Sequence, residues 1–447
     1  MFRRLAISCI FAVTILSAMA RTRPHYGGTL RVEVAGDPWE RPNGVARRLA
    51  YDGLTQMDAR GILRPALALA WEPDNNFHRW QFRLRQGVRF QDGSSLTSAT
   101  VAASLMASCA ANCPWDAVKA VGPLVVFTNG EPMPNLPALL ASDQFLVQQI
   151  ASSDQKSASG AVGTGPYQVT GFNNGVLALA ANENCWSGRP FADGIEIRVR
   201  RPVRDQWLDL GLGRADVVEV PAEQVRQAQQ QRLSVLSSPP VALLALQLSD
   251  KGALADVKLR AAIAAAVDRS ALFNVIFQKQ GDVTASLLPQ KMTGYSFLFP
   301  TERDLNKSHE LRGGLTAGLL TLSVQGDGAI QLAAQRIALN LREAGFNVQM
   351  VNGTQPADLV LRELPIVGAD PAAALERLMW ETGEVAGIAE QTPTALFKRE
   401  QQILEGKRII PLLDLPVAYA SGARVRDLGL RADGTPELAD ASLEDPR

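Results

Sequence analysis

The sequence is poor in the residues from which many enzyme centres are built. Of 447 residues only three are histidine and four are cysteine, and the histidines are scattered without a partner signature. There is no G-x-S-x-G elbow, H-E-x-x-H helix, Walker loop or dinucleotide fingerprint. The Gly163–Gly165 loop lacks the lysine and the helix start of a phosphate-binding loop. We therefore expect no enzyme activity, no catalytic residue, no cofactor and no metal site.

An excess of either charge sign is also missing. The 45 Lys and Arg residues balance 45 Asp and Glu residues, and no long run of like charge occurs. The bulk charge thus gives no indication of a nucleic acid or an anionic surface as partner. Hydrophobic residues make up 46% and charged residues 20%, as in globular proteins with a sizeable core. The length allows two or three domains.

Long apolar runs are absent after the first twenty residues. Arg3 and Arg4 precede an apolar run, Leu5 to Leu16, and small residues follow as far as Ala20. These are the parts of a secretory signal peptide, and the run is shorter than the roughly 20 residues that span a bilayer. The alternative is a buried N-terminal helix. We expect cleavage after Ala20 and an exported protein, periplasmic or otherwise extracytoplasmic.

Three cysteines remain after this cleavage, namely Cys109, Cys113 and Cys185. An oxidising compartment allows one disulfide and one free thiol, with three ways to pair them. Cys109 and Cys113 are close in sequence, and a local disulfide between them is possible if the helix ends there. Asn112 and Pro114 indicate such an end. A metal site at these cysteines would lack nearby histidine ligands.

The most regular pattern lies between residues 79 and 105. Trp80, Phe82 and Leu84 share one face of a half-buried strand, and its arginines occupy the solvent side. An Asp-Gly turn follows, and Thr97 is a good N-cap for a helix. The predicted buried residues of this helix are Val101, Leu105 and Met106.

Strands and helices alternate along most of the remaining chain, which indicates an α/β fold. A hairpin is predicted around 173–175. Strands are predicted at 29–34, 124–128, 241–248, 346–351, 358–361 and 409–413. Helices are predicted at 256–276, at 331–344 with Leu332, Ile337 and Leu341 on or near its buried side, and at 394–404.

Five segments occur in the order seen in one family: "YGGTLRVEVAGDP", "AYDGLTQMDARGILRPALALAWEPDNNFHRWQFRLRQGVRFQDGSSLTSATVAASL", "VGTGPYQVTGF", "NCWSGRPFADGIEIRV" and "LADVKLRAAIAAAVDRSALFNVI". The chain resembles the family 5 extracellular solute-binding proteins, which are the dipeptide/oligopeptide-binding components of ABC importers. The resemblance covers nearly all of the chain after the signal peptide. Family members often have an acid where this chain has Thr100, so the helix start lacks the carboxylate half of a capping box.

The resemblance implies a bilobed periplasmic-binding-protein fold with two α/β lobes, a hinge and a shortened inserted domain. The hinge would consist of two crossing strands, near 241–248 and 412–419. A peptide or other small ligand would bind in the cleft, and hinge closure would deliver it to the membrane subunits of an ABC permease. The protein would be a monomer. The implied domains are a signal peptide at 1–20, lobe I at 21–54, 163–240 and 415–447, the insert at 55–162, and lobe II at 241–414.

The resemblance also implies a set of ligand-binding residues: Gly36, Asp37, Trp39, Glu363, Val367 and Asp370. Peptide-binding members carry a W-x-x-D-x-x-D-P-like segment, which "LRELPIVGADPAAAL" matches at Asp370. Val367 stands where the acid that anchors the peptide amine is expected, and Leu364 replaces the tryptophan. A buried ammonium without a carboxylate would cost several kcal/mol. Glu363 can take the place of the missing acid only if the backbone path differs from that of the family. The identity of the ligand is therefore left undetermined by the sequence.

Two other functions remain possible from the sequence. One is a sensor module that presents its ligand to a membrane receptor without transport. The other is an exported hydrolase on a two-lobed scaffold, which lacks a catalytic signature in this chain.

Overall fold

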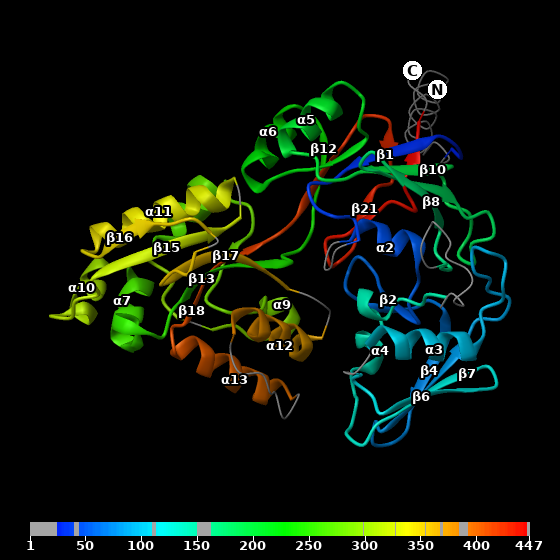
Figure 1. The fold of residues 1–447 in the computed structure, drawn as a ribbon, viewed down its shortest axis with the longest axis horizontal. Coiled ribbons are helices and arrows are strands. Elements are labelled where there is room, and N and C mark those ends of the chain that lie inside the picture. Colours follow the sequence, from blue (N-terminus) through cyan, green and yellow to red (C-terminus); the bar gives the residue numbers. More distant parts are fainter. Residues whose placement is uncertain are drawn as a thin grey trace, which may run out of the picture.

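The chain folds into two α/β lobes and a smaller third unit, which Figure 1 shows side by side. The computed structural model describes residues 25–39, 44–109, 113–149, 162–297, 299–326, 328–353, 355–366, 370–383 and 392–444. The predicted signal peptide, residues 1–20, and Val367 lie outside the described residues. The mixed α/β architecture is the one that the alternating pattern predicts.

The first lobe, at the upper right of Figure 1, is built on a seven-stranded sheet. Its central strand β1 (Thr29–Glu33) runs parallel to both of its neighbours, and Leu30 and Val32 point into the core. The order is β12 (Ser234–Ser237), β19 (Ala418–Ser421), β11 (Val217–Glu219), β1, β10 (Gly194–Arg198), β9 (Val176–Ala181) and β8 (Tyr167–Asn173). Three separate stretches of chain therefore meet in one sheet. The exact domain boundaries stay a prediction.

The smaller unit, at the lower right of Figure 1, has its own antiparallel sheet and its own core. The order is β4 (Ala68–Pro73), β5 (Arg79–Leu84), β7 (Leu124–Thr128) and β6 (Ala117–Val121). Trp80 and Phe82 face the core as predicted, and Arg83 is exposed. Arg85 differs from the prediction, because it is half-buried and its guanidinium lies 4.7 Å above the ring of Trp186.

Helix α3 (Ser98–Cys109) covers this sheet and is capped by two hydroxyls. The Thr100 N–H donates to Oγ1 of Thr97 at 3.1 Å, and the Thr97 N–H donates to Oγ1 of Thr100 at 3.0 Å. A hydroxyl therefore does what the missing carboxylate would do, and the reciprocal cap is complete. Leu105 is buried as predicted, but the prediction for Met106 is wrong, since 56% of it is exposed.

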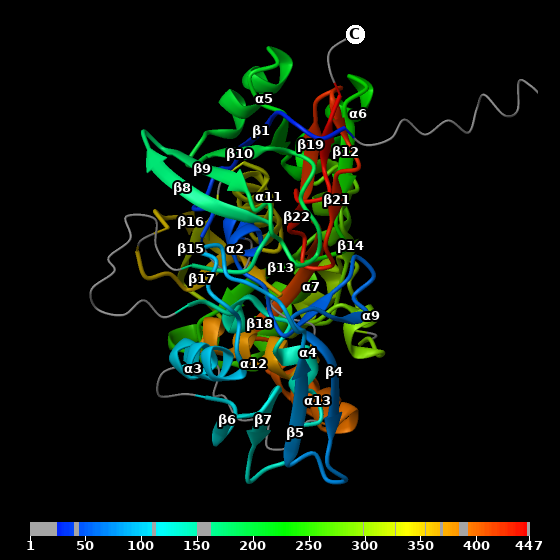
Figure 2. The same ribbon diagram turned by 90° about the vertical axis from the view of Figure 1, so that its right-hand side faces the viewer.

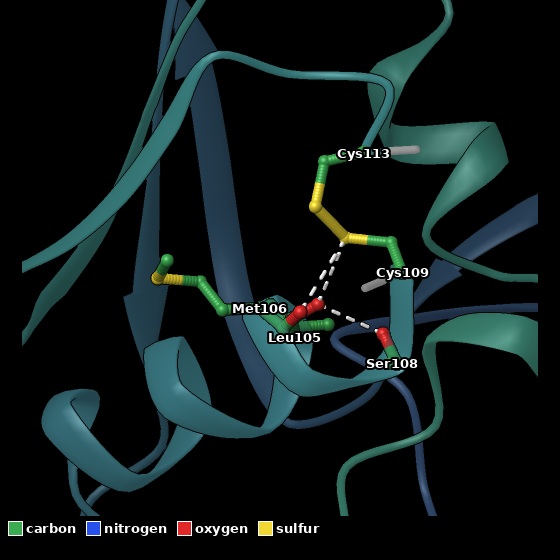
Figure 3. The surroundings of a disulfide bond; sticks show 5 residues. All are labelled: Leu105, Met106, Ser108, Cys109 and Cys113. Atoms are coloured by element: carbon green, nitrogen blue, oxygen red, sulfur yellow. Dashed lines mark hydrogen bonds between the residues drawn. A yellow bond between two sulfur atoms is a disulfide. The ribbon is translucent and has the colours of Figure 1, made fainter. Parts of the chain in front are cut away.

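A disulfide closes the end of α3. Figure 3 shows Cys109, the last residue of the helix, joined to Cys113, with the Cys109 sulfur 3.3 Å from the carbonyl oxygen of Leu105. Cys185 keeps a free, buried thiol. Burial raises the pKa of this thiol, so it is held in its uncharged form.

The second lobe, at the left of Figure 1, has a six-stranded sheet between two layers of helices. The strand order is β14 (Asp282–Val283), β18 (Ile409–Leu415), β13 (Ala242–Leu248), β17 (Leu359–Pro365), β15 (Leu319–Gln325) and β16 (Asn347–Met350). Alternate residues of β13 enter the two opposite cores. One layer contains α7 (Val257–Ala266), α10 (Leu305–Arg312) and α11 (Ala329–Glu343), and the other contains α12 (Pro371–Thr382) and α13 (Pro393–Glu405).

Two helix predictions in this lobe are wrong in detail. The helix predicted over 256–276 stops before Val267, because Oδ1 of Asp268 accepts the N–H of Ala271 at 2.8 Å and starts a new turn. In α11, Leu332 is 49% exposed rather than buried. The buried stripe of α11 is made mainly of alanine, which lets the helix approach the sheet closely.

The lobes are connected by two short segments, 238–241 and 416–417, which lie between β12 and β13 and between β18 and β19. They are hydrogen-bonded to each other, since the N–H of Ser238 donates to the Val417 carbonyl at 2.9 Å. The Val417 N–H donates back to Oγ of Ser238 at 3.1 Å. The strands predicted to cross are therefore present, and the crossing itself is confined to these two segments.

The remaining elements are short. The helices are α2 (Val45–Ala50), α4 (Leu136–Leu139), α5 (Val203–Gly211), α6 (Val225–Gln230), α8 (Arg269–Ala271) and α9 (Gln290–Thr293), with single turns η1 (Asp143–Phe145), η2 (Ala222–Gln224), η3 (Gly252–Ala255) and η4 (Leu272–Ile276). The strand pairs are β2 (Thr55–Met57) with β3 (Leu63–Pro65), β20 (Val425–Arg426) with β23 (Ser442–Leu443), and β21 (Gly429–Leu430) with β22 (Pro436–Glu437). None of the helices in the described ranges is long and apolar enough to cross a membrane.

Candidate functional site

Three of the predicted ligand-binding residues lie together just after β1. Gly36 and Asp37 are exposed, and the position of a Cβ on Gly36 has no atom within 4 Å. The Trp39 N–H donates to Oδ1 of Asp37 at 2.9 Å, which closes a short turn. Trp39 is half-buried against Tyr51, with the ring centres 6.3 Å apart. Asp37 and Trp39 therefore shape the loop, while Gly36 leaves open space in front of it.

The neighbouring strand end is held by Glu219, the last residue of β11. Its Oε2 accepts the N–H of Ala35 at 2.7 Å and the side-chain amide of Gln206 at 3.3 Å. Burial raises the pKa of Glu219, and these two donors act against the rise. The Ala35 N–H is thus already used, while Ala35, Gly36 and Asp37 are exposed.

Glu363 lies near the end of β17 in the second lobe. Its side chain is accessible to solvent, but enough protein surrounds it that desolvation raises the pKa of the carboxyl. Among the described residues, no hydrogen bond or ion pair to Glu363 is present. Glu363 is therefore an exposed carboxyl group at this strand end.

Asp370 is engaged on both carboxylate oxygens. Oδ2 accepts the N–H of Ala373 and caps α12, at 2.9 Å, and Oδ1 accepts the side-chain amide of Asn135 at 2.7 Å. Asn135 directly precedes α4 in the smaller unit, so this hydrogen bond joins that unit to the second lobe. Only 9% of Asp370 is exposed. In this conformation Asp370 connects two units and is not open to a ligand.

The predicted residues thus form two groups rather than one. Gly36, Asp37 and Trp39 share one loop of the first lobe, and Glu363 and Asp370 flank one loop of the second. Val367, the replaced anchor, lies outside the described residues. No hydrogen bond or ring contact between described residues connects the two groups.

A cavity of about 660 Å³ lies beside the crossing segments in the second lobe. None of the six predicted residues lines it. Its walls come from Pro240 of one crossing segment, from β14 and α9, and from the 296–302 loop. Figure 2 shows β14 and α9 on the same edge of the molecule. The cavity combines apolar walls with charged side chains, as ligand sites do.

Asp414 lies at the buried side of this cavity, near the end of β18. It is 6% exposed and pairs in register with Asp282 of β14. The backbone approach is close, because a Cβ on Gly281 would lie 2.2 Å from the Asp414 carbonyl oxygen. Oδ1 of Asp414 has no hydrogen-bond donor among the described residues. A buried carboxylate oxygen without a partner is costly.

The surroundings of Asp414 push its carboxyl toward the protonated form. Burial raises its pKa to about 7, and the nearby carboxylates of Asp282 and Glu400 add to the rise. The hydroxyl of Thr284 and the charge of Lys291 act in the opposite direction. No ion pair within 4 Å joins Asp414 to Lys291 among the described residues. The carboxyl therefore changes its charge in the neutral pH range.

Neither Asn135 nor Asp414 is among the residues predicted from the sequence. Asn135 had no visible signal, since one asparagine before a proline-containing turn is common. Asp414 did have one, because it is the single charge in the strand Ile409–Leu415, in which every residue is buried. Charged residues are rarely buried in this way without a partner or a role.

Comparison with known proteins identifies the family. The family model for bacterial extracellular solute-binding proteins, family 5, matches residues 63–374. The chain therefore belongs to this family of ABC-importer components, which are binding proteins and not enzymes. The hydrolase alternative is set aside. The chain is 26% identical to Protein XP55 of Streptomyces lividans over 436 residues, which is 89% of this chain and 77% of that protein.

Solved structures show the same fold at low sequence identity. NikA from Brucella suis in complex with Fe(III)-EDTA matches with a TM-score of 0.80 and 19% identity, over 93% of this chain and all of that one. The oligopeptide-binding protein AppA from Bacillus subtilis, in complex with a nonapeptide, matches with a TM-score of 0.77 and 16% identity. That match covers 95% of this chain and 100% of AppA. The predicted family and fold class are confirmed.

Proposed function

We propose that this chain is the exported binding component of an ABC importer. It captures a peptide-like or other small solute between its lobes and delivers it to the membrane permease by closing about the crossing segments. The domain boundaries, the signal peptide, the extracytoplasmic location and the monomeric state given above are parts of this proposal.

The paired crossing segments carry the proposal. They connect two lobes that each have their own core, so the lobes can rotate as bodies without unfolding. A ligand that contacts both lobes stabilises the closed form by the difference in its affinity for the two forms. The hydrogen bond from Asn135 to Asp370 supplies a further contact between units that closure would adjust.

Gly36, Asp37, Trp39, Glu363, Val367 and Asp370 are the proposed ligand-facing residues from the two lobes. Asp370 would face the ligand only after its hydrogen bond to Asn135 is broken. The exposed loop at Gly36 and the accessible carboxylate of Glu363 support this assignment. The relatives' bound nonapeptide and Fe(III)-EDTA support peptides and metal chelates as the ligand classes to test.

The test is a thermal-unfolding screen of residues 21–447 against di- to nonapeptides with free and acetylated N-termini, sugars, opines and metal chelates. A true ligand at one hundred times its Kd stabilises the protein by about 2.7 kcal/mol. A panel that leaves the melting temperature unchanged throughout would refute the proposal.

Gly36→Leu sharpens the same experiment. Because a Cβ at Gly36 would have no atom within 4 Å, we expect the variant to keep the fold and to fill the space in front of the loop. We expect at least a tenfold loss of ligand affinity by titration calorimetry. Gly211→Leu is the matched control, since Gly211 at the end of α5 has equally open surroundings. Equal affinity of the two variants would remove Gly36 from the site.

A further inference from the structure

The cavity beside the crossing segments has an excess of acid. Its charged side chains are those of Asp282, Glu302 and Asp414, against the single ammonium of Lys291. Three carboxylates against one ammonium leave a net negative potential inside this space. The cavity therefore favours a cationic group and disfavours an anion.

Asp414 is the carboxylate of this group that lacks a hydrogen-bond donor on one oxygen, among the described residues. Its unpartnered Oδ1 belongs to a side chain that lines the cavity and is almost fully buried. Folding could have supplied a donor, as it did for the nearby Glu400, whose Oε1 accepts the N–H of Leu287 at 2.6 Å and whose Oε2 accepts the Tyr295 hydroxyl at 2.9 Å. At Asp414 the Thr284 hydroxyl is a hydrogen-bonding neighbour, but Oδ1 has no donor among the described residues, so a donor from a ligand in the cavity would reach it by a rotation of the carboxyl group.

The walls limit what this donor can be. No group of three or more metal-binding side chains is arranged for a metal ion within the described residues, which speaks against a bare metal. Phe297, Phe299 and Pro240 contribute an apolar lining. The volume of about 660 Å³ lies in the range of cavities that hold small organic ligands. An organic cation with an apolar body fits both features.

We propose that this cavity binds the ammonium group of an organic ligand, with Asp414 as the hydrogen-bond acceptor and Asp282 as a second counter-charge. The inference rests on the proposed function and narrows its substrate class to amines. It also supplies a carboxylate for a ligand amine in a chain in which Val367 replaces the expected anchor.

Binding of the ammonium depends on pH. The charged groups that face Asp414 are Asp282 on β14, Glu400 on α13 and Lys291 on α9. The carboxylates favour protonation of Asp414, and the protonated carboxyl does not attract a cation. Affinity for an amine therefore rises as the pH increases through the neutral range.

The test compares phenethylamine, which is charged at neutral pH, with its neutral isostere 2-phenylethanol. Titration calorimetry or saturation-transfer NMR on residues 21–447 gives the Kd at pH 8 and pH 5.5. We expect the amine to bind the native chain at pH 8, and at least tenfold more weakly at pH 5.5 and in Asp414→Asn. The alcohol should show no change. Asp205→Asn is the matched control, since Asp205 is a partly exposed carboxylate on α5 in the other lobe.

Each outcome decides the inference. Equal binding of amine and alcohol, or an Asp414→Asn variant that retains the amine, overturns it. If the amine fails to bind while a peptide or chelate stabilises the protein, the inference falls and the proposed function stands. If nothing in either screen binds, both fall. The pH and alcohol comparisons use the native chain, so they do not depend on how the variant folds.

Discussion

Two buried aspartates, one in each lobe, have opposite surroundings. Asp216 in the first lobe is 2% exposed and is held by the guanidinium groups of Arg31 and Arg424, at 2.6–3.1 Å. Burial raises its pKa, but these hydrogen bonds outweigh burial and hold the pKa below its usual value. Asp414 in the second lobe is similarly buried, no cation of the described residues lies within ion-pair distance of it, and its pKa is raised to about 7.

The two aspartates therefore differ in role. Asp216 is a charge that holds the structure together, and Asp414 is a charge that a ligand can use. Arg31 belongs to β1 and Arg424 follows β19, so the first aspartate ties together distant parts of one sheet. The second aspartate has the Thr284 hydroxyl beside it but no ion-paired cation among the described residues, and it costs stability whenever it is ionised. A protein keeps such a cost where function needs the charge.

The largest expected effect comes from Asp414→Asn. Because the folded pKa lies above the unfolded one, the native chain loses stability as the pH rises from about 4 to about 7. The neutral amide avoids this loss, so the variant should be more stable at pH 8 by up to about 4 kcal/mol. Urea unfolding at pH 8 and pH 5 measures it. A variant that is less stable at pH 8 would mean that Asp414 has a structural partner.

Asp216→Asn should act in the opposite direction. Losing the carboxylate leaves two guanidinium groups without their counter-charge, at a cost of about 3 kcal/mol at pH 7. This is the low end for a buried pair, because about a third of each arginine side chain is exposed. The stabilisation is present above the usual aspartate pKa and disappears as the pH falls below the lowered one. A variant as stable as the native chain in urea at pH 7 would contradict this account.

Glu400→Gln gives the smallest effect and tests the reason for the contrast. Glu400 is fully buried, and burial raises its pKa while the N–H groups of Leu287 and Leu288 and the Tyr295 hydroxyl lower it. Glutamine can keep an acceptor for these donors, so we expect a change of only about 1 kcal/mol at pH 8. A gain as large as that of Asp414→Asn would show that burial alone, and not the missing donor, sets the cost.

Local sequence patterns predicted the strands and helix caps well where one face of the element packs against a single core. The alternation of Trp80 and Phe82 and the Thr97 cap are repeated in the structure because they depend on near neighbours only. The errors at Met106 and Leu332 have a different origin. Helical periodicity places a stripe within about one residue, and the packing partner decides which side chain at its edge is covered.

The candidate site depends on contacts that local patterns do not contain. The hydrogen bond between Asn135 and Asp370 spans 235 residues of sequence. The cavity at Asp414 is lined by residues of both β14 and β18, which pair with each other. Asp370 was predicted from the family resemblance alone. The predicted role was ligand binding, whereas the structure shows a contact between two units.

The sequence by itself determined the family, the α/β class and the lack of catalytic machinery, because these depend on ordered segments, on periodicity and on residue types. The tertiary structure alone decided which charges are satisfied. Asp216 directly precedes β11 and Asp414 lies near the end of β18, each beside apolar residues, and the local sequence alone does not show which of them a guanidinium will reach. Whether a donor reaches a buried carboxylate is settled by strands that come from hundreds of residues away.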